Sequence, residues 1–200
     1  MTSFLSDWAT RARRWAHGQP YAIWYDRAYR LPFASIEAST GIDPRRADMV
    51  LSYLVGSGFL LAGDVRTPSR IRYEDLARVH TPELLESLQD PAAIAQAFAV
   101  DASDVVVDEV VHTIRIACGG TLAAAREALG TRGPPLNLLG GFHHAGRARG
   151  GGFCIVNDIA VAVAAVRREG FKKRVAVLDL DAHPPDGTAD CFAGDPSVWV

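Results

Sequence analysis

Three side chains that can bind a metal ion follow a short apolar segment late in the sequence. Residues 174–178 (Arg-Val-Ala-Val-Leu) are typical of a strand buried on both faces, and Asp179, Asp181 and His183 come next at alternate positions. Alternate side chains of an extended backbone point to the same side. Because buried carboxylates are costly without a partner, this segment, the metal loop (residues 179–187), indicates a divalent cation. Its donors suit zinc, with manganese and iron left open.

Two adjacent histidines follow the predicted strand before it. Residues 135–139 are apolar, and His143-His144 come shortly afterwards, behind two glycines. Together with a helix predicted over 158–170, they form a strand–helix–strand unit of the length of a right-handed parallel crossover. Such a unit places its two strands side by side, or nearly so, with both carboxyl ends at one edge of the sheet. We therefore expect the histidine pair to lie next to the metal loop.

These residue types are suited to metal-assisted hydrolysis. A cation polarises a carbonyl and lowers the pKa of a bound water, and a neighbouring histidine takes the proton of that water. His143 and His144 could be metal ligands, but acid–base roles beside the metal are more economical. Asp179 and Asp186 flank the two ligand positions and are available to fix the tautomer of each imidazole. Asp-x-Asp alone also occurs in magnesium sites for phosphoryl transfer. The prediction of a hydrolytic metal site therefore depends on His183 and on the pair His143-His144.

Helices and a glycine-rich segment must position these groups. Apolar spacing predicts helices over 45–55, 73–80 and 83–88, after a first strand over 21–25. A longer helix is predicted over 105–129, although it contains two adjacent glycines. Those glycines cost roughly 2 kcal/mol relative to alanine, which is tolerable if another backbone passes close to the helix there.

A second glycine-rich segment, residues 150–152, lacks the lysine and the spacing of a phosphate-binding loop. The glycines let the backbone approach closely, so this segment is predicted to form a narrow channel lined by Gly152 and Phe153. The other interpretation of Phe153 is a plain core residue.

The composition is that of one α/β domain. The chain has 200 residues, of which 48% are hydrophobic, and a net charge of −2, so a nucleic-acid or membrane-surface binder is not indicated. No apolar run reaches transmembrane length. Three widely spaced cysteines give no disulfide framework and favour a reducing compartment, so we expect a cytoplasmic protein. Residues 1–20 are predicted to form an N-terminal arm whose aromatic side packs on a domain over 21–200.

Three motifs occur in one order: Gly140-Gly-Phe-His-His-Ala145, Gly152-Phe-Cys-Ile-Val-Asn-Asp158 and Asp179-Leu-Asp-Ala-His183. Their order and spacing resemble those of the zinc-dependent histone deacetylase family, which includes bacterial acetylpolyamine- and acetoin-utilisation-type relatives. Weaker similarity around residues 44–47, 79–82 and 118–120 extends the resemblance over nearly the whole chain from Tyr21.

The resemblance implies a three-layer open parallel α/β sheet of the arginase/deacetylase type. The implied activity is removal of an acyl group from acyl-lysine or an acylpolyamine. Asp181 and His183 would bind one zinc ion. The resemblance also implies that His144, with Asp186, is the general base and that His143, with Asp179, is its acid or electrostatic partner. Phe153 and Gly152 would line a substrate tunnel, Arg46 would lie in an internal channel, and Asp104 would bind substrate at the rim. Backbone atoms of Asp179 and His183 would help to bind a structural potassium ion.

The sequence departs from the family pattern in two places. Pro184-Pro185 follows the ligand histidine where the family usually has His-Gly, and this removes two N–H donors from the metal loop. The family's third ligand, an aspartate, and its oxyanion tyrosine would lie beyond Val200. We therefore expect the N-terminal portion of a longer enzyme. The alternatives are a manganese ureohydrolase, a catalytically inactive acyl-amine-binding protein and a partial gene product.

Overall fold

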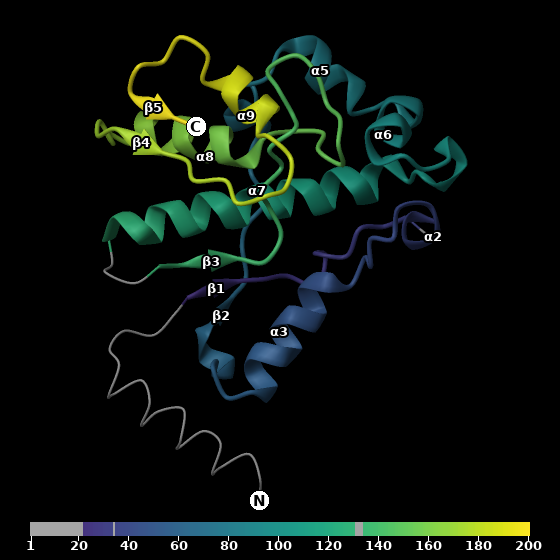
Figure 1. Ribbon diagram of the computed structural model, residues 1–200, viewed down its shortest axis with the longest axis horizontal. Helices are drawn as coiled ribbons and strands as arrows, with labels where there is room; N and C mark the ends of the chain where they lie inside the picture. The colour runs from purple at the N-terminus through teal and green to yellow at the C-terminus, as the bar shows by residue number, and fades with distance from the viewer. Residues whose placement is uncertain (1–21, 34, 131–133) are drawn as a thin grey trace, which may run out of the picture.

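Two small parallel sheets organise the chain. The computed structural model describes residues 22–33, 35–130 and 134–200, so the predicted N-terminal arm lies outside the described residues. Strands β1 (Ile23–Trp24), β2 (Val65–Arg66) and β3 (Leu136–Asn137) pair in the order β2-β1-β3, and β4 (Val175–Ala176) pairs with β5 (Val198–Trp199). Every pairing between these strands is parallel, as expected for an α/β fold (Figure 1).

Several helices begin where the sequence provides a side-chain cap. Thr81 and Asp90 accept hydrogen bonds from backbone amides of the helices that follow them, and each stands before a proline. The predicted helices over 45–55 and 105–129 are confirmed, with bounds shifted by one or two residues. The helical elements are α2 (Ile36–Thr40), α3 (Arg46–Gly56), η1 (Ala62–Asp64), α4 (Tyr73–Leu76), α5 (Pro82–Ser87), α6 (Pro91–Phe98), η2 (Ala102–Asp104), α7 (Val107–Gly130), α8 (Asp158–Arg168) and α9 (Asp186–Cys191).

The long helix α7 runs through the middle of the molecule and packs along α8 (Figure 1). Its two central glycines let other chain segments approach. A Cβ at Gly119 would lie 1.7 Å from the carbonyl oxygen of Ser69, and one at Gly120 would lie 2.2 Å from the hydroxyl of Tyr29. The predicted close approach of another backbone is therefore confirmed.

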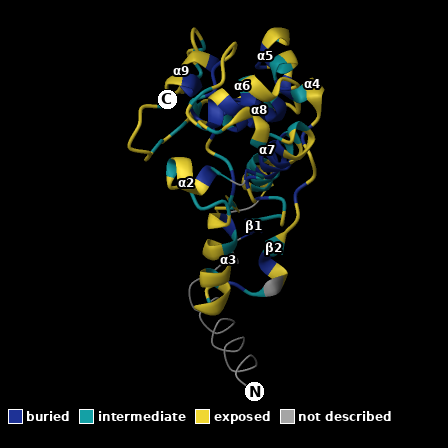
Figure 2. Cartoon of the chain, turned by 90° about the vertical axis from the view of Figure 1, so that its right-hand side faces the viewer, coloured by how far each residue is buried: buried dark blue, intermediate teal, exposed yellow. Residues whose placement is uncertain are grey.

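The core surrounds α7 and α8. Their facing side chains are buried, whereas α3 projects from the rest of the molecule and is mostly exposed (Figure 2). Within the described residues, no helix is both long enough and apolar enough to span a membrane.

Two expectations about the crossover were wrong. Strand β4 is not buried on both faces, because Leu178 and Leu180 just beyond it are 83% and 85% exposed. Strands β3 and β4 are not hydrogen-bonded neighbours, since β3 pairs with β1 and β4 pairs with β5. The apolar pattern indicates a strand, but it does not tell which other elements cover the strand.

Candidate active site

His143 and Asp179 form the inner of two histidine–aspartate pairs. His143 Nδ1 lies 2.8 Å from Asp179 Oδ2, and the side chains are only 8% and 16% exposed. A carboxylate only accepts hydrogen bonds, so Nδ1 carries the hydrogen and Nε2 is the free ring nitrogen. The predicted meeting of the histidine pair with the metal loop is thus present, although β3 and β4 are not adjacent.

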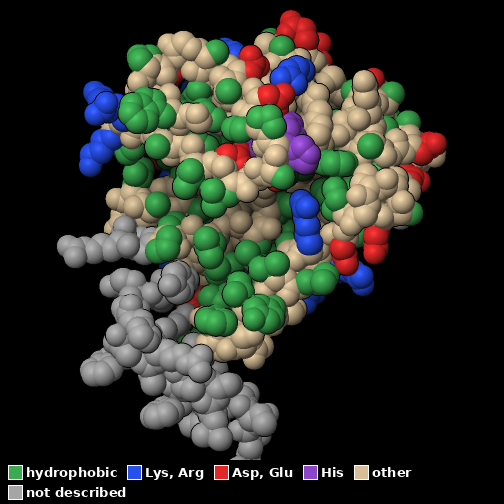
Figure 3. Space-filling view, in the orientation of Figure 1, with side chains coloured by type: hydrophobic (Ala, Val, Ile, Leu, Met, Phe, Trp, Pro, Cys, Tyr) green, Lys and Arg blue, Asp and Glu red, His purple; other side chains and the backbone are tan. Residues whose placement is uncertain are grey.

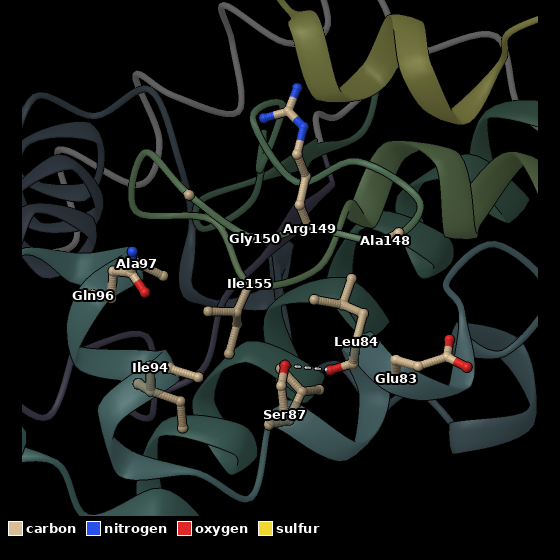
Figure 4. Close-up of a pocket in the computed structure, with 13 residues that line it drawn as sticks. Glu83, Leu84, Ser87, Ile94, Gln96, Ala97, Ala148, Arg149, Gly150 and Ile155 are labelled. Carbon is tan, nitrogen blue, oxygen red and sulfur yellow. Dashed lines mark hydrogen bonds between the residues drawn. The ribbon is translucent and has the colours of Figure 1, made fainter.

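His144 and Asp186 form the outer pair. His144 Nδ1 lies 2.6 Å from Asp186 Oδ1, and Arg149 donates to the other carboxylate oxygen at 2.8 Å. These hydrogen bonds, that of His144 first, hold the pKa of Asp186 well below its usual range. Figure 4 shows the Arg149 side chain pointing away from a neighbouring pocket lined by Ile94 and Ile155, toward α9. The role of Arg149 has no signal in the sequence.

Asp181 and His183, the predicted zinc ligands, point toward each other. His183 Nδ1 lies 3.0 Å from Asp181 Oδ1, and the His183 amide donates to the same oxygen at 2.8 Å. The hydrogen bond from that amide lowers the pKa of Asp181 first, and the imidazole adds to it. His143 Nε2 is 4.0 Å from Asp181 Oδ1, so the inner pair faces these donors.

The donor set fits zinc in kind but is incomplete in number. A carboxylate oxygen and an imidazole nitrogen are common zinc ligands, and catalytic zinc sites usually have three protein ligands. Within the part of the chain that the structure describes, no three His, Cys, Asp or Glu side chains converge as a metal site would require.

The two prolines of the metal loop lead directly into helix α9. Pro185 occupies the N-cap position, and Asp186 is the first residue of the helix. The Asp186 amide donates to the carbonyl of Pro184 at 2.8 Å. Asp186 therefore reaches His144 despite the departure from the family pattern.

The histidines of the two pairs share a cavity of about 430 Å³ with Asp181 and His183 of the metal loop. Histidine and acidic side chains lie next to one another on the face shown in Figure 3. Arg46, Gly152 and Phe153 line this cavity with His143, His144, Asp181 and His183. Asp104, at the end of η2, does not line it. Its remaining walls are apolar or glycine: Leu31, Ile42, Leu139, Gly140, Gly141, Phe142 and Cys154.

The glycine-rich segment brings backbone against the outer pair. Gly152 and Phe153 both have left-handed backbone angles, with φ of 54° and 65°. A Cβ at Gly152 would lie 2.4 Å from Cδ2 of His144, so only glycine fits beside that ring. The Phe153 amide donates to the carbonyl of Ala97 at 2.9 Å, which anchors the segment to the end of α6.

Two buried polar residues hold the histidine segment, which we define as residues 140–146 around the histidine pair. The sequence did not predict this role for either of them. His80 Nε2 accepts from the Asn157 amide, and its Nδ1 lies 3.0 Å from the carbonyl oxygen of Gly146. Burial lowers the pKa of His80, which favours the neutral ring that this pairing requires. Asn157 caps α8 and also donates to the carbonyl of Ala145 at 3.0 Å. The sequence signal that could have pointed to this role is that both residues are polar and lie among apolar neighbours.

The fold and the paired histidine–aspartate groups define an open α/β protein with a candidate hydrolytic site. The histone deacetylase-type motifs seen in the sequence agree with a family model described as "Histone deacetylase domain", which matches residues 41–200. The chain belongs to this family.

Individual relatives and solved structures agree. The chain is 32% identical over 184 residues to "Histone deacetylase 2" of Arabidopsis thaliana, covering 90% of this chain and 47% of that protein. It is 34% identical over 144 residues to "Acetoin utilization protein AcuC" of Bacillus subtilis (strain 168), covering 68% of this chain and 37% of that protein. The chain thus spans less than half the length of these two relatives.

Solved structures confirm the predicted open α/β fold of the arginase/deacetylase type. The crystal structure of the HDA15 HD domain superposes with a TM-score of 0.72 at 24% identity, over 90% of this chain and 51% of that one. A histone deacetylase homologue complexed with SAHA superposes with a TM-score of 0.68 at 22% identity, over 91% of this chain and 50% of that one.

Proposed function

We propose that this chain carries part of the active site of a zinc-dependent hydrolase that removes an acyl group from an acylated amine. The main support for this proposal is that His143 and His144, each paired with an aspartate, line one cavity together with Asp181 and His183. Membership of the histone deacetylase family supports the reaction class. Acyl-lysine and acylpolyamines are the substrates we propose.

Asp181 and His183 would provide two of the zinc ligands, since their oxygen and nitrogen donors already lie within 3.0 Å of each other. When bound, zinc supplies a Lewis acid that polarises an amide carbonyl and makes water easier to deprotonate. We further propose that backbone atoms of Asp179 and His183 contribute to a structural potassium ion.

His144 is the proposed general base. Its Nδ1 hydrogen is held by Asp186, which leaves Nε2 as the atom that takes a proton from water. The carboxylate also stabilises the imidazolium that forms, because the two charges are opposite and adjacent. Arg149 holds the second oxygen of Asp186 and so keeps the carboxylate oriented.

His143 is the proposed acid or electrostatic partner. It is more buried than His144, and its Nε2 faces Asp181. With Nδ1 held by Asp179, a protonated His143 can donate from Nε2 to the leaving amine. Gly152 and Phe153 would guide the acylated amine along the cavity wall. Asp104, as a contact to the substrate backbone, stays a prediction.

The test measures release of acetate from an acetyl-lysine peptide and from an acetylpolyamine by the full-length protein. A His144→Ala variant is expected to lose activity, and His112→Ala, an exposed histidine on α7, serves as the matched control. Equal activity of the two variants would contradict the role of His144. Urea release from a guanidino substrate would instead support a ureohydrolase, and binding of acyl-lysine without turnover would support an inactive binding protein.

A further inference from the structure

Asp158 is a fully buried carboxylate at the first position of α8, and neither pair of the candidate site uses it. Both of its oxygens accept hydrogen bonds from the segment that leads to the histidines. The Phe142 amide donates to Oδ1 at 2.7 Å, and the Gly141 amide donates to Oδ2 at 3.1 Å. Thr121, on α7, donates its hydroxyl hydrogen to Oδ2 at 2.5 Å.

Thr121 is itself part of a chain of partly buried hydrogen bonds. Asn137, on β3, donates to the Thr121 hydroxyl and to the carbonyl of Ala117, each at 2.9 Å. The Tyr29 hydroxyl in turn donates to Asn137 Oδ1 at 2.6 Å. The carboxylate of Asp158 is therefore fixed by α7 and β3, as well as by its own helix.

The histidine segment fits closely against this carboxylate. A Cβ at Gly140 would lie 2.5 Å from Asp158 Oδ2 and 2.8 Å from the Thr121 hydroxyl, so only glycine leaves room. Gly141 has a left-handed φ of 75°, which turns the chain just before His143. Asn157, rather than Asp158, provides the side-chain cap of α8.

We infer that Asp158 is a positioning residue: it binds the two amides that precede His143 and thereby sets where His143 and His144 stand over the metal loop. This inference rests on the proposed function for its effect on catalysis, but the contacts themselves do not depend on it. Burial raises the pKa of Asp158, while the three donors and the N-terminal end of α8 favour the anion. Removing the carboxylate leaves the buried Phe142 amide and the partly buried Gly141 amide without this acceptor, which favours a different turn.

The experiment compares Asp158→Asn with wild type in the full-length protein. Hydrogen–deuterium exchange of the peptide containing residues 140–145 should become faster, because an amide group offers only one acceptor oxygen. We expect kcat to fall about 10- to 100-fold, as for other residues that orient catalytic groups, with KM changed less than about twofold. Asp108→Asn, which alters an exposed carboxylate in the first turn of α7, should change neither the exchange nor kcat.

Thr121 provides a second route if Asp158→Asn does not fold. Thr121→Val removes one donor to Asp158 and should weaken protection of residues 140–145, whereas Thr121→Ser should restore it. Unchanged exchange in Asp158→Asn or in Thr121→Val would overturn the inference. If wild type hydrolyses no acylated amine, the proposed function fails, and exchange at residues 140–145 still decides the role of Asp158.

Discussion

Replacing Gly152 by alanine tests whether the outer histidine–aspartate pair depends on the glycine-rich segment. The new Cβ would lie 2.4 Å from Cδ2 and 2.8 Å from Cγ of the His144 ring, so the ring must rotate away. That rotation breaks the 2.6 Å contact between His144 Nδ1 and Asp186. A displacement of about 1 Å at a catalytic group typically costs about 100-fold in rate, so we expect kcat to fall by about that factor.

The same substitution at Gly194 provides a matched control. Both glycines have left-handed backbones, with φ of 54° and 80°, but a Cβ at Gly194 would meet nothing within 4 Å. Gly194→Ala should therefore lose roughly 1 to 2 kcal/mol of stability in urea unfolding, and Gly152→Ala at least as much. Only Gly152→Ala should also lose turnover of an acetyl-lysine peptide. Wild-type kcat in Gly152→Ala, or an equal loss in Gly194→Ala, would refute the reasoning.

Three further predictions concern the buried polar network, the thiols and acid stability. Asn157→Ala should destabilise the protein by about 3 to 5 kcal/mol in urea unfolding, because it removes a helix cap and leaves buried partners unsatisfied; a loss below about 1 kcal/mol would contradict this. Burial raises the pKa of Cys154 and of Cys191 to about 12 and that of Cys118 well above its usual value. A thiol reagent at pH 8 should therefore label these cysteines only after unfolding, and rapid labelling of native protein would be the contrary result. Hydrogen bonds from Ser197 and Arg167 lower the pKa of Asp195 to about 2, below the unfolded value of about 3.9. The unfolded state therefore binds more protons between these pH values, and the free energy of unfolding falls as pH drops through them. Asp195→Asn should show a smaller fall in stability, and a fall equal to that of wild type would argue against the ion pair.

Much of the candidate site could be predicted because strand polarity brings distant residues together. The crossover rule brought His143 next to Asp179 across 36 residues of sequence, and the contact of 2.8 Å in the structure agrees. The alternation of Asp181 with His183 likewise predicted their shared side. Both expectations depend only on local pattern and handedness, which the sequence contains.

What could not be predicted depends on tertiary packing. The apolar run ending at Leu178 indicated a strand buried on both faces, but burial depends on which elements cover it, and Leu178 is exposed. Asp158 and His80 hold backbone groups far away in sequence, so periodicity gives no sign of their partners. The contact of Arg149 with Asp186 is of the same kind, since it joins a loop to the first residue of α9.

The most direct test of the central claim is removal of metal from the full-length protein, followed by stepwise return of zinc while acetate release from an acetyl-lysine peptide is measured. The account predicts that activity disappears with the metal and returns fully at one zinc ion per chain. It also predicts that Asp181→Ala and His183→Ala variants neither retain zinc nor recover activity. Hydrolysis that continues undiminished in the metal-free protein would contradict the account.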